Sequence, residues 1–112
     1  MGAWGRIQER QRRLGTFLCV GLDPDPDRMP AGQSLEEFCL AVMAETAPFA
    51  CAFKPNSAFF EAAGLGGWRA LFKVMAFARE LGVPAILDAK RGDIGNTARF
   101  YAKAAFDELG AD

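Results

Sequence analysis

Three short apolar runs alternate along the chain with longer stretches of helical character. The runs occupy residues 16–23, 49–56 and 83–90, and each is almost entirely apolar until it ends in charged residues. Strands that are apolar on both faces are typical of a parallel sheet covered by helices. The pattern therefore predicts an α/β chain in which a strand–helix unit occurs three times.

The first two helical stretches carry recognisable start and stop signals. Residues 6–15 are polar and helix-prone, and a glycine closes them. Ser34 and Glu37 have the spacing of a capping box, in which each side chain bonds the other residue's backbone N–H. Apolar residues recur after them at helical spacing, which predicts a helix to about Ala47.

The second half of the chain contains two further helical stretches. Residues 57–81 are predicted to be mostly helical, with a break in their glycine-rich part and a stop at Gly82. A last helix is predicted from a cap at Asn96 or Thr97 to Gly110.

Doubly wound sheets and (β/α)8 barrels both fit this alternation. No Gly-x-Gly-x-x-Gly loop follows the first run, which argues against a dinucleotide-binding sheet. Instead the runs end in Asp23, in Lys54, and in Asp88 and Lys90. Charges at the carboxyl ends of consecutive parallel strands are typical of a barrel active site. We therefore predict the first three strand–helix units of a (β/α)8 TIM barrel.

The length of the chain bears on its domain organisation. A barrel of this kind takes about 250 residues, whereas this chain has 112. A three-stranded domain, complete as given, is the alternative, but it would leave a long apolar sheet edge open. We expect residues 1–112 to be the N-terminal part of a single barrel domain that is incomplete at its C-terminus.

The charged ends of the runs predict a cluster of opposite charges. Side chains two apart on a strand share a face, so Asp88 and Lys90 are expected to point the same way, roughly 7 Å apart along the strand. Lys54 ends the neighbouring strand about 5 Å away, with Asp93 just beyond the strand end and Asp23 beside the group. The cluster is either a catalytic site or a salt-bridge network that closes one end of a barrel.

Composition narrows the chemistry. The chain has no histidine, which excludes Ser-His-Asp triads and the usual zinc sites from these residues, so catalysis would depend on carboxylates and lysines. Its net charge of −1 argues against nucleic acid as a partner. No run is long enough to span a bilayer and no signal-peptide core is present, so we expect a cytoplasmic protein. Its three cysteines, in apolar contexts, are expected to be reduced core residues.

Three segments of the sequence together resemble one enzyme family. They are "CVGLDPD", "FKPNSAFFEAAG" and "DAKRGDIGNTA", and the last contains Asp-x-Lys-x-x-Asp. In this order and at predicted strand ends, they are similar to the long bacterial branch of the orotidine 5'-monophosphate decarboxylases. The resemblance implies a (β/α)8 barrel that converts orotidine 5'-monophosphate to uridine 5'-monophosphate and carbon dioxide, in de novo pyrimidine biosynthesis, without cofactor or metal.

The resemblance also implies roles for single residues. Lys90 would donate a proton to the pyrimidine carbon that loses its carboxylate, and Asp88 would lie against that carboxylate. Lys54 would bridge Asp88 and the ribose, and Asp23 would bind a ribose hydroxyl.

The resemblance also implies a homodimer, in which Asp93 and Thr97 would reach across an interface to the partner's site. The family binds the substrate phosphate near the last strands of its barrel, outside these 112 residues. The isolated chain is therefore expected to be inactive.

Two alternatives remain at this point. Sister decarboxylases and aldolases that act on sugar phosphates share Asp-x-Lys-x-x-Asp but use magnesium, held partly by a carboxylate on the second strand. Lys54 stands there in this chain, and its charge would repel the metal. The other alternative is a non-catalytic truncated chain that folds poorly or only binds a partner.

Overall fold

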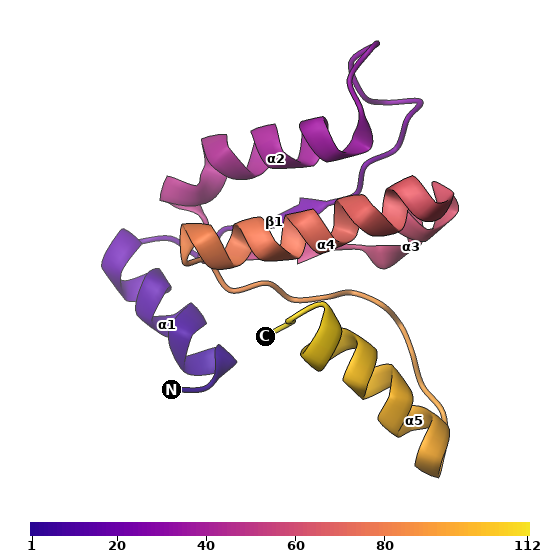
Figure 1. Cartoon of the computed structure of the whole chain (residues 1–112). Helices are drawn as coiled ribbons and strands as arrows, with labels where there is room; N and C mark the ends of the chain where they lie inside the picture. Colours follow the sequence, from indigo (N-terminus) through magenta and orange to yellow (C-terminus); the bar gives the residue numbers. More distant parts are fainter.

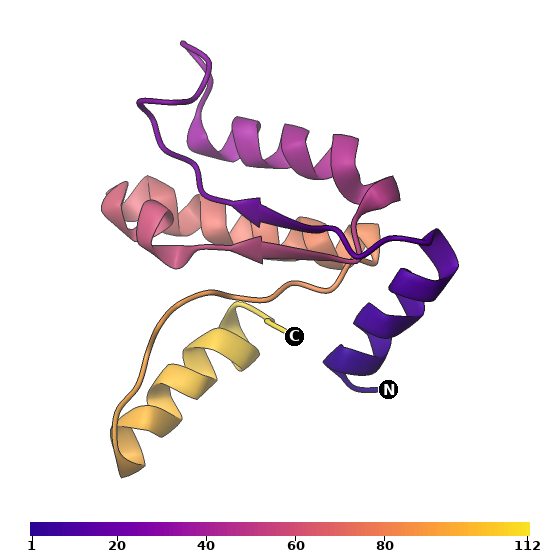
Figure 2. The ribbon, with the colours of Figure 1, turned by 180° about the vertical axis from the view of Figure 1, so that it is seen from behind.

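The computed structural model describes all 112 residues of the chain, Met1–Asp112. Figure 1 shows the order of the elements, and Figure 2 shows the strands in front, with α4 behind them, α2 above them, and α1 and α5 below. The elements are α1 (Ala3–Leu14), β1 (Cys19–Leu22), α2 (Leu35–Thr46), the 3-10 turn η1 (Ala47–Phe49), β2 (Ala52–Pro55), α3 (Ser57–Ala62), α4 (Gly64–Leu81), α5 (Gly95–Ala102) and the π-helical η2 (Lys103–Glu108).

The first two predicted strands form a parallel pair. β1 and β2 are in register from Cys19 opposite Ala52 to Leu22 opposite Pro55. The chain returns from one to the other through α2, as expected for parallel neighbours, which need a crossover connection. This part of the sequence prediction is confirmed.

The third predicted strand, residues 83–90, is not a continuous strand. The segment runs beside β2, but it forms only two isolated parallel bridges, Ala85 with Phe53 and Asp88 with Asn56. Both bridges have the same offset along the chain, so the segment keeps one register throughout. The prediction placed this segment correctly and was wrong about its regular pairing.

A proline explains the gap between the two bridges. The register brings the nitrogen of Pro55 to the carbonyl of Ile86, and proline has no N–H to donate. The other hydrogen bonds of the pairing form: Ile86 N donates to the carbonyl of Phe53 at 2.8 Å, and Asp88 N to that of Pro55 at 3.0 Å. The strand is interrupted by one missing donor and not by a change of direction.

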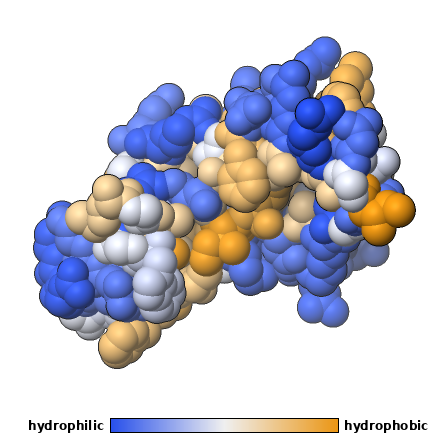
Figure 3. Space-filling view, turned by 90° about the horizontal axis from the view of Figure 1, so that it is seen from below, coloured by the Kyte–Doolittle hydropathy of each residue, from blue (hydrophilic) through white to orange (hydrophobic).

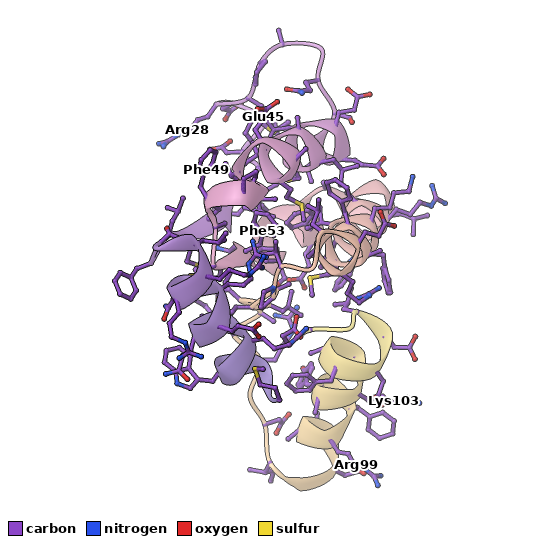
Figure 4. The ribbon with its side chains drawn as sticks, turned by 90° about the vertical axis from the view of Figure 1, so that its left-hand side faces the viewer. Arg28, Glu45, Phe49, Phe53, Arg99 and Lys103 are labelled. Atoms are coloured by element: carbon purple, nitrogen blue, oxygen red, sulfur yellow. The ribbon has the colours of Figure 1, made fainter.

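Side chains alternate between the two faces of this sheet. Phe53 is fully buried on the face that packs against the helices, and Figure 4 shows it at the centre of the molecule. Six residues of β1, β2 and the third extended segment belong to this core or pack against it: Val20, Leu22, Phe53, Val83, Ala85 and Leu87. Lys54 and Asp88, each one position further along, lie on the other face, where their side chains meet. The hydrophobic core thus fixes which face carries the charges.

Helix α1 is attached to the rest of the fold by a buried arginine. Arg10 is only 9% exposed, and it donates to the carbonyls of Ala47 and Ala50, each at 2.9 Å, and of Gly82 at 3.4 Å. These carbonyls lie at or just after the ends of α2, η1 and α4, where helices leave carbonyls unpaired. Burial lowers the pKa of Arg10. One side chain therefore joins three helical elements.

The predicted helix ends are confirmed for α1, α2 and α4. The capping box at α2 is complete: Glu37 N donates to Ser34 Oγ at 3.1 Å, and Ser34 N donates to the Glu37 carboxylate at 3.2 Å. Gly15 and Gly82, with φ of 63° and 69°, end α1 and α4 in the left-handed conformation that glycine adopts without strain. The predicted break falls at Ala63, between α3 and Gly64, the first residue of α4.

The predicted cap of the last helix is wrong. Ile94 is the N-cap of α5 and has no capping side chain, so Asn96 and Thr97 lie inside the first turn. The Asn96 side-chain oxygen accepts a hydrogen bond from the Arg99 side chain at 2.6 Å and is not directed to a backbone N–H. Arg99 and Lys103 lie on this last helical region in Figure 4.

The chain end lies beside the third extended segment. Asp112 N donates to the carbonyl of Ala85 at 3.0 Å, and Ala85 N donates to the Asp112 carboxylate at 2.9 Å. Between α1 and η2 an apolar groove of about 350 Å³ opens over this region, and Trp4, Ile86 and Phe106 line it. Figure 3 shows apolar side chains gathered on this face.

The cysteines are all unpaired, and two of the three are core residues. Cys39 and Cys51 are buried, whereas Cys19 is exposed, contrary to the prediction for it. Burial raises the pKa of Cys39 to about 12, so this thiol stays protonated and unreactive at neutral pH. Among the helices, none combines the length and the apolar character that crossing a membrane requires.

Replacement of Arg10 tests whether it holds α1 in place. Arg10→Met keeps an unbranched apolar stem but leaves the carbonyls without their donor, so we expect the free energy of unfolding to fall by about 3 kcal/mol. Arg13→Met, an exposed position on the same helix, is the matched control and should change it by less than about 0.5 kcal/mol. Urea unfolding followed by circular dichroism measures both. Equal effects of the two substitutions would contradict this role.

Candidate active site

Asp88 is held at the carboxyl end of the paired segments by its backbone. Its N–H donates to the carbonyl of Pro55 at 3.0 Å, and its own carbonyl accepts from Ser57 N at 3.1 Å. These two bonds form the bridge with Asn56, directly after the gap that Pro55 leaves. Asn56 also caps α3, because its side chain accepts from Ala58 N at 3.1 Å. The carboxylate therefore starts from a rigid point of the fold.

Two lysines donate to this carboxylate. Lys90 Nζ lies 2.5 and 2.7 Å from the two oxygens of Asp88, and Lys54 Nζ lies 3.4 Å from Oδ2. Exposure falls toward the middle of the cluster: the side chain of Lys90 is 75% exposed, that of Lys54 41% and that of Asp88 19%. The predicted contact between Lys54, Asp88 and Lys90 is present in the structure.

The two ammonium groups stabilise the ionised form of the carboxylate. The hydrogen bond from Lys90 contributes most to lowering the pKa of Asp88, and that from Lys54 adds to it, while desolvation acts in the opposite direction. Two positive charges and one negative charge leave the cluster with a net charge of +1. Such a cluster suits an anionic substrate and can donate a proton from a lysine.

Asp23 lies near this cluster without a direct contact to it. Its carboxylate oxygen is 3.5 Å from where a side chain of Gly21 would begin, and Gly21 pairs with Lys54 in the sheet. Cross-strand neighbours share a face, so Asp23 lies on the face of Lys54. Its side chain is exposed, and the glycine leaves open space in front of it.

Asp93 and Thr97 are not part of the cluster. Both are exposed, and the Asp93 carboxylate accepts a hydrogen bond from the adjacent Ile94 N at 2.7 Å. We expected two lysines and two carboxylates in the cluster. The structure brings the two lysines to a single carboxylate, that of Asp88. Asp93 lies between Lys90, whose φ is 51°, and a bend at Ile94, so it does not continue the direction of the strand.

A second ion pair next to the cluster was not predicted. Arg91 pairs with Glu61 of α3, and its guanidinium also donates to the carbonyl of Ala89 at 2.7 Å. Its charge centre lies 6.0 Å from the ring of Tyr101 in α5. Glu61 and Arg91 are 30 positions apart, and no local motif in the sequence connects them.

One cavity lies beside residues 87–92, and Lys90 of the cluster is among the residues that line it. It has a volume of about 360 Å³, and Trp68, Leu87, Tyr101 and Leu109 form much of its apolar wall. Lys54 and Asp88 do not line it, so we do not assign the site to this cavity. No group of three or more His, Cys, Asp or Glu side chains is placed to hold a metal ion.

Comparison with known sequences decides which family the fold and the cluster represent. Residues 16–112 match the family described as orotidine 5'-phosphate decarboxylase / HUMPS. The chain belongs to this family. The match includes all six residues of the predicted site, and it confirms the resemblance drawn from the three sequence segments.

Curated relatives in the decarboxylase family are about half identical to this chain. The orotidine 5'-phosphate decarboxylase of Roseiflexus sp. is 52% identical over 106 residues, which cover 90% of this chain and 38% of the relative. The one from Dehalococcoides mccartyi is 52% identical over 111 residues, which cover 96% of this chain and 39% of the relative. The chain spans 38–39% of the length of these two relatives.

Solved decarboxylase structures share the fold of this chain. Leishmania donovani OMP decarboxylase superposes with a TM-score of 0.83 at 43% identity, over 99% of this chain and 42% of that one. UMP synthase of the same organism gives a TM-score of 0.85 at 43% identity, over 99% of this chain and 24% of that one. The predicted fold, three strand–helix units of a (β/α)8 barrel, is confirmed.

Titration of Asp88 tests the electrostatics of the cluster. Lys90→Ala should raise the pKa of the Asp88 carboxyl, and Lys54→Ala should raise it less, because Lys90 contributes the larger share. Carboxyl ¹³C NMR measures both shifts, with Lys73→Ala, which breaks an ion pair with Glu36, as the control. A carboxyl with a lowered pKa stabilises the fold above its unfolded-state pKa, and this contribution is lost as the pH falls through the folded pKa. In Lys90→Ala the folded pKa is higher, so this contribution should be smaller and its loss complete at a higher pH, and an unmoved Asp88 would contradict the cluster.

Proposed function

We propose that the protein that carries these residues decarboxylates orotidine 5'-monophosphate to uridine 5'-monophosphate, without metal or cofactor, as a step of pyrimidine biosynthesis. Residues 1–112 would supply the first three strand–helix units of a single decarboxylase barrel. The contact of Lys90 with Asp88, next to Lys54 at the carboxyl ends of parallel strands, carries this proposal. Membership of the decarboxylase family supports it.

The cluster fits the charge changes of this reaction. When the carbon–carbon bond breaks, carbon dioxide leaves and the bonding electron pair stays on the pyrimidine carbon. An ammonium fixed beside that carbon stabilises the developing negative charge, and Lys90 then transfers a proton to it. Asp88 would lie against the departing carboxylate and accept hydrogen bonds from the Lys90 ammonium. Solvent would return a proton to Lys90.

The remaining residues of the site would bind the substrate. Lys54 lies between Asp88 and the space in front of Gly21, where it would reach the ribose. Asp23, on the same face, would accept a hydrogen bond from a ribose hydroxyl. Asp93 and Thr97 would contribute to the site of a second subunit in a homodimer. We also propose a cytoplasmic location, which the three unpaired cysteines support.

A chimera tests the proposed activity with the residues of this chain. Residues 16–112 replace the matching segment of the Roseiflexus sp. decarboxylase, and we expect a turnover number within about tenfold of the parent's. Lys90→Ala in the chimera removes the charge and the proton source, and should lower kcat by about 10⁴-fold. Lys73→Ala, on the outer side of α4, is the matched control and should have no effect.

The same assay separates this proposal from a magnesium-dependent reaction. The positive charge of Lys54 opposes a divalent cation, so the chimera should keep its full rate in excess chelator. A folded chimera without activity, or one whose activity disappears with chelator and returns with magnesium, would contradict the proposal.

Subunit exchange tests the role of Asp93 across a dimer. Lys90→Ala and Asp93→Ala chimeras, each nearly inactive, are mixed until their subunits exchange. Random pairing makes about half of the dimers mixed, and one of the two sites in each mixed dimer regains both residues. Activity should therefore recover to about a quarter of the unsubstituted level. If mass spectrometry confirms exchange and activity stays at the single-variant level, Asp93 acts within its own chain.

A further inference from the structure

The backbone of Lys90 is in an unusual conformation. Its φ is 51°, and every other residue with positive φ in the chain is a glycine. The left-handed region is unfavourable for a residue with a side chain, because Cβ comes close to a carbonyl oxygen. Such a conformation persists only where neighbouring groups hold it in place.

Arg91 supplies two contacts that can hold it. Its Nη1 reaches back and donates to the carbonyl of Ala89, the residue before Lys90, at 2.7 Å. Its Nη2 pairs with Oε1 of Glu61. The side chain of Arg91 therefore closes a ring around the backbone of Lys90, and Glu61 attaches that ring to α3.

The attachment point is itself well fixed. Helix α3 begins directly after Asn56, the residue whose backbone bridges Asp88. Glu61 and the Asp88 carboxylate are thus positioned from the same strand end. The side chains of Arg91 and Glu61 are 36% and 28% exposed, whereas Arg28, in a surface ion pair, is 87% exposed.

We infer that the Glu61–Arg91 pair is a positioning device, which keeps Lys90 in its left-handed conformation and so keeps its ammonium on Asp88. A lysine in place of Arg91 cannot do this, because a single ammonium lacks the planar fork that reaches a carbonyl and a carboxylate together. Lys90 itself cannot replace these contacts, since its side chain is mostly exposed and hydrogen-bonds only to Asp88. Only the consequence for catalysis rests on the proposed function.

NMR titration of Asp88 in the 112-residue chain tests this positioning directly. Arg91→Lys and Glu61→Gln should each raise the pKa of Asp88, because Lys90 leaves the carboxylate. Arg99→Lys, at an arginine of α5 that bonds Asn96, is the matched control and should leave it unchanged. In a Lys90→Ala background, Arg91→Lys should have no further effect on Asp88, because the pair acts through Lys90.

The outcomes separate positioning from mere stabilisation. If Arg91→Lys lowers the melting temperature and leaves the pKa of Asp88 unmoved, the inference is wrong. If Asp88 shifts equally with and without Lys90, Arg91 acts on the carboxylate by itself and the inference is again wrong. Should Arg91→Lys fail to fold, the milder Glu61→Gln decides by the same two criteria.

Activity in the chimera gives an independent measurement. A misplaced proton donor should lower kcat by about a hundredfold and leave KM within about twofold. A rise in KM with an unchanged kcat would overturn the inference, since it would place the pair in substrate binding. If the chimera does not decarboxylate at all, the proposed function fails, while the titration of Asp88 still decides the positioning.

Discussion

The parallel register between β2 and residues 85–88 is the constraint on which the site depends. It brings Asp88 to the end of the strand that carries Lys54, and the bridge with Asn56 fixes the carboxylate just where regular pairing resumes. A shift by one residue would turn Asp88 toward the helices and bury a charge in the core. The buried Val83 and Ala85 of the same segment oppose such a shift because they would have to leave that core.

The same register places apolar side chains on one face of the sheet and the charged cluster on the other. Apolar side chains on one face bury against α2 and α4, and this burial supplies most of the stabilisation. The other face carries small or charged residues such as Gly21, Lys54 and Asp88, which leave room for a ligand. The charged cluster can therefore be changed with little effect on the core, and the core can be conserved while the chemistry varies.

Much of this organisation could be predicted from the sequence because it depends on local rules. The capping box at Ser34 and the glycines at 15 and 82 act within a few residues, and alternation along the strands placed Lys54 and Asp88 on one face. The interruption at Pro55 had a signal in the sequence, since a proline cannot donate within a sheet. Its effect depended on which residue of the third segment faces it, and only the folded register determines that.

Other features depend on tertiary contacts and had no sequence signal. Nothing in the sequence around Lys90 indicates its left-handed backbone. Arg91 follows it, and Glu61, the partner of Arg91, lies on the earlier helix α3. Asn96 was a reasonable cap by residue type, but its side chain bonds to Arg99. In both cases a polar side chain bonds to another side chain, Arg91 to Glu61 and Arg99 to Asn96, and no local pattern in the sequence indicates that pairing.

The attachment of α1 through Arg10 has a consequence for the response of the fold to its surroundings. All the partners of Arg10 are neutral carbonyls, so no acid titration removes them, and salt screens a charge–dipole contact inside the protein only weakly. A second link of α1, the ion pair of Arg6 with Asp112, joins two charged side chains and is open to both effects. Acid or high salt therefore loosens the segment around residue 112 first, while the N-terminal helix stays docked against α2 and α4.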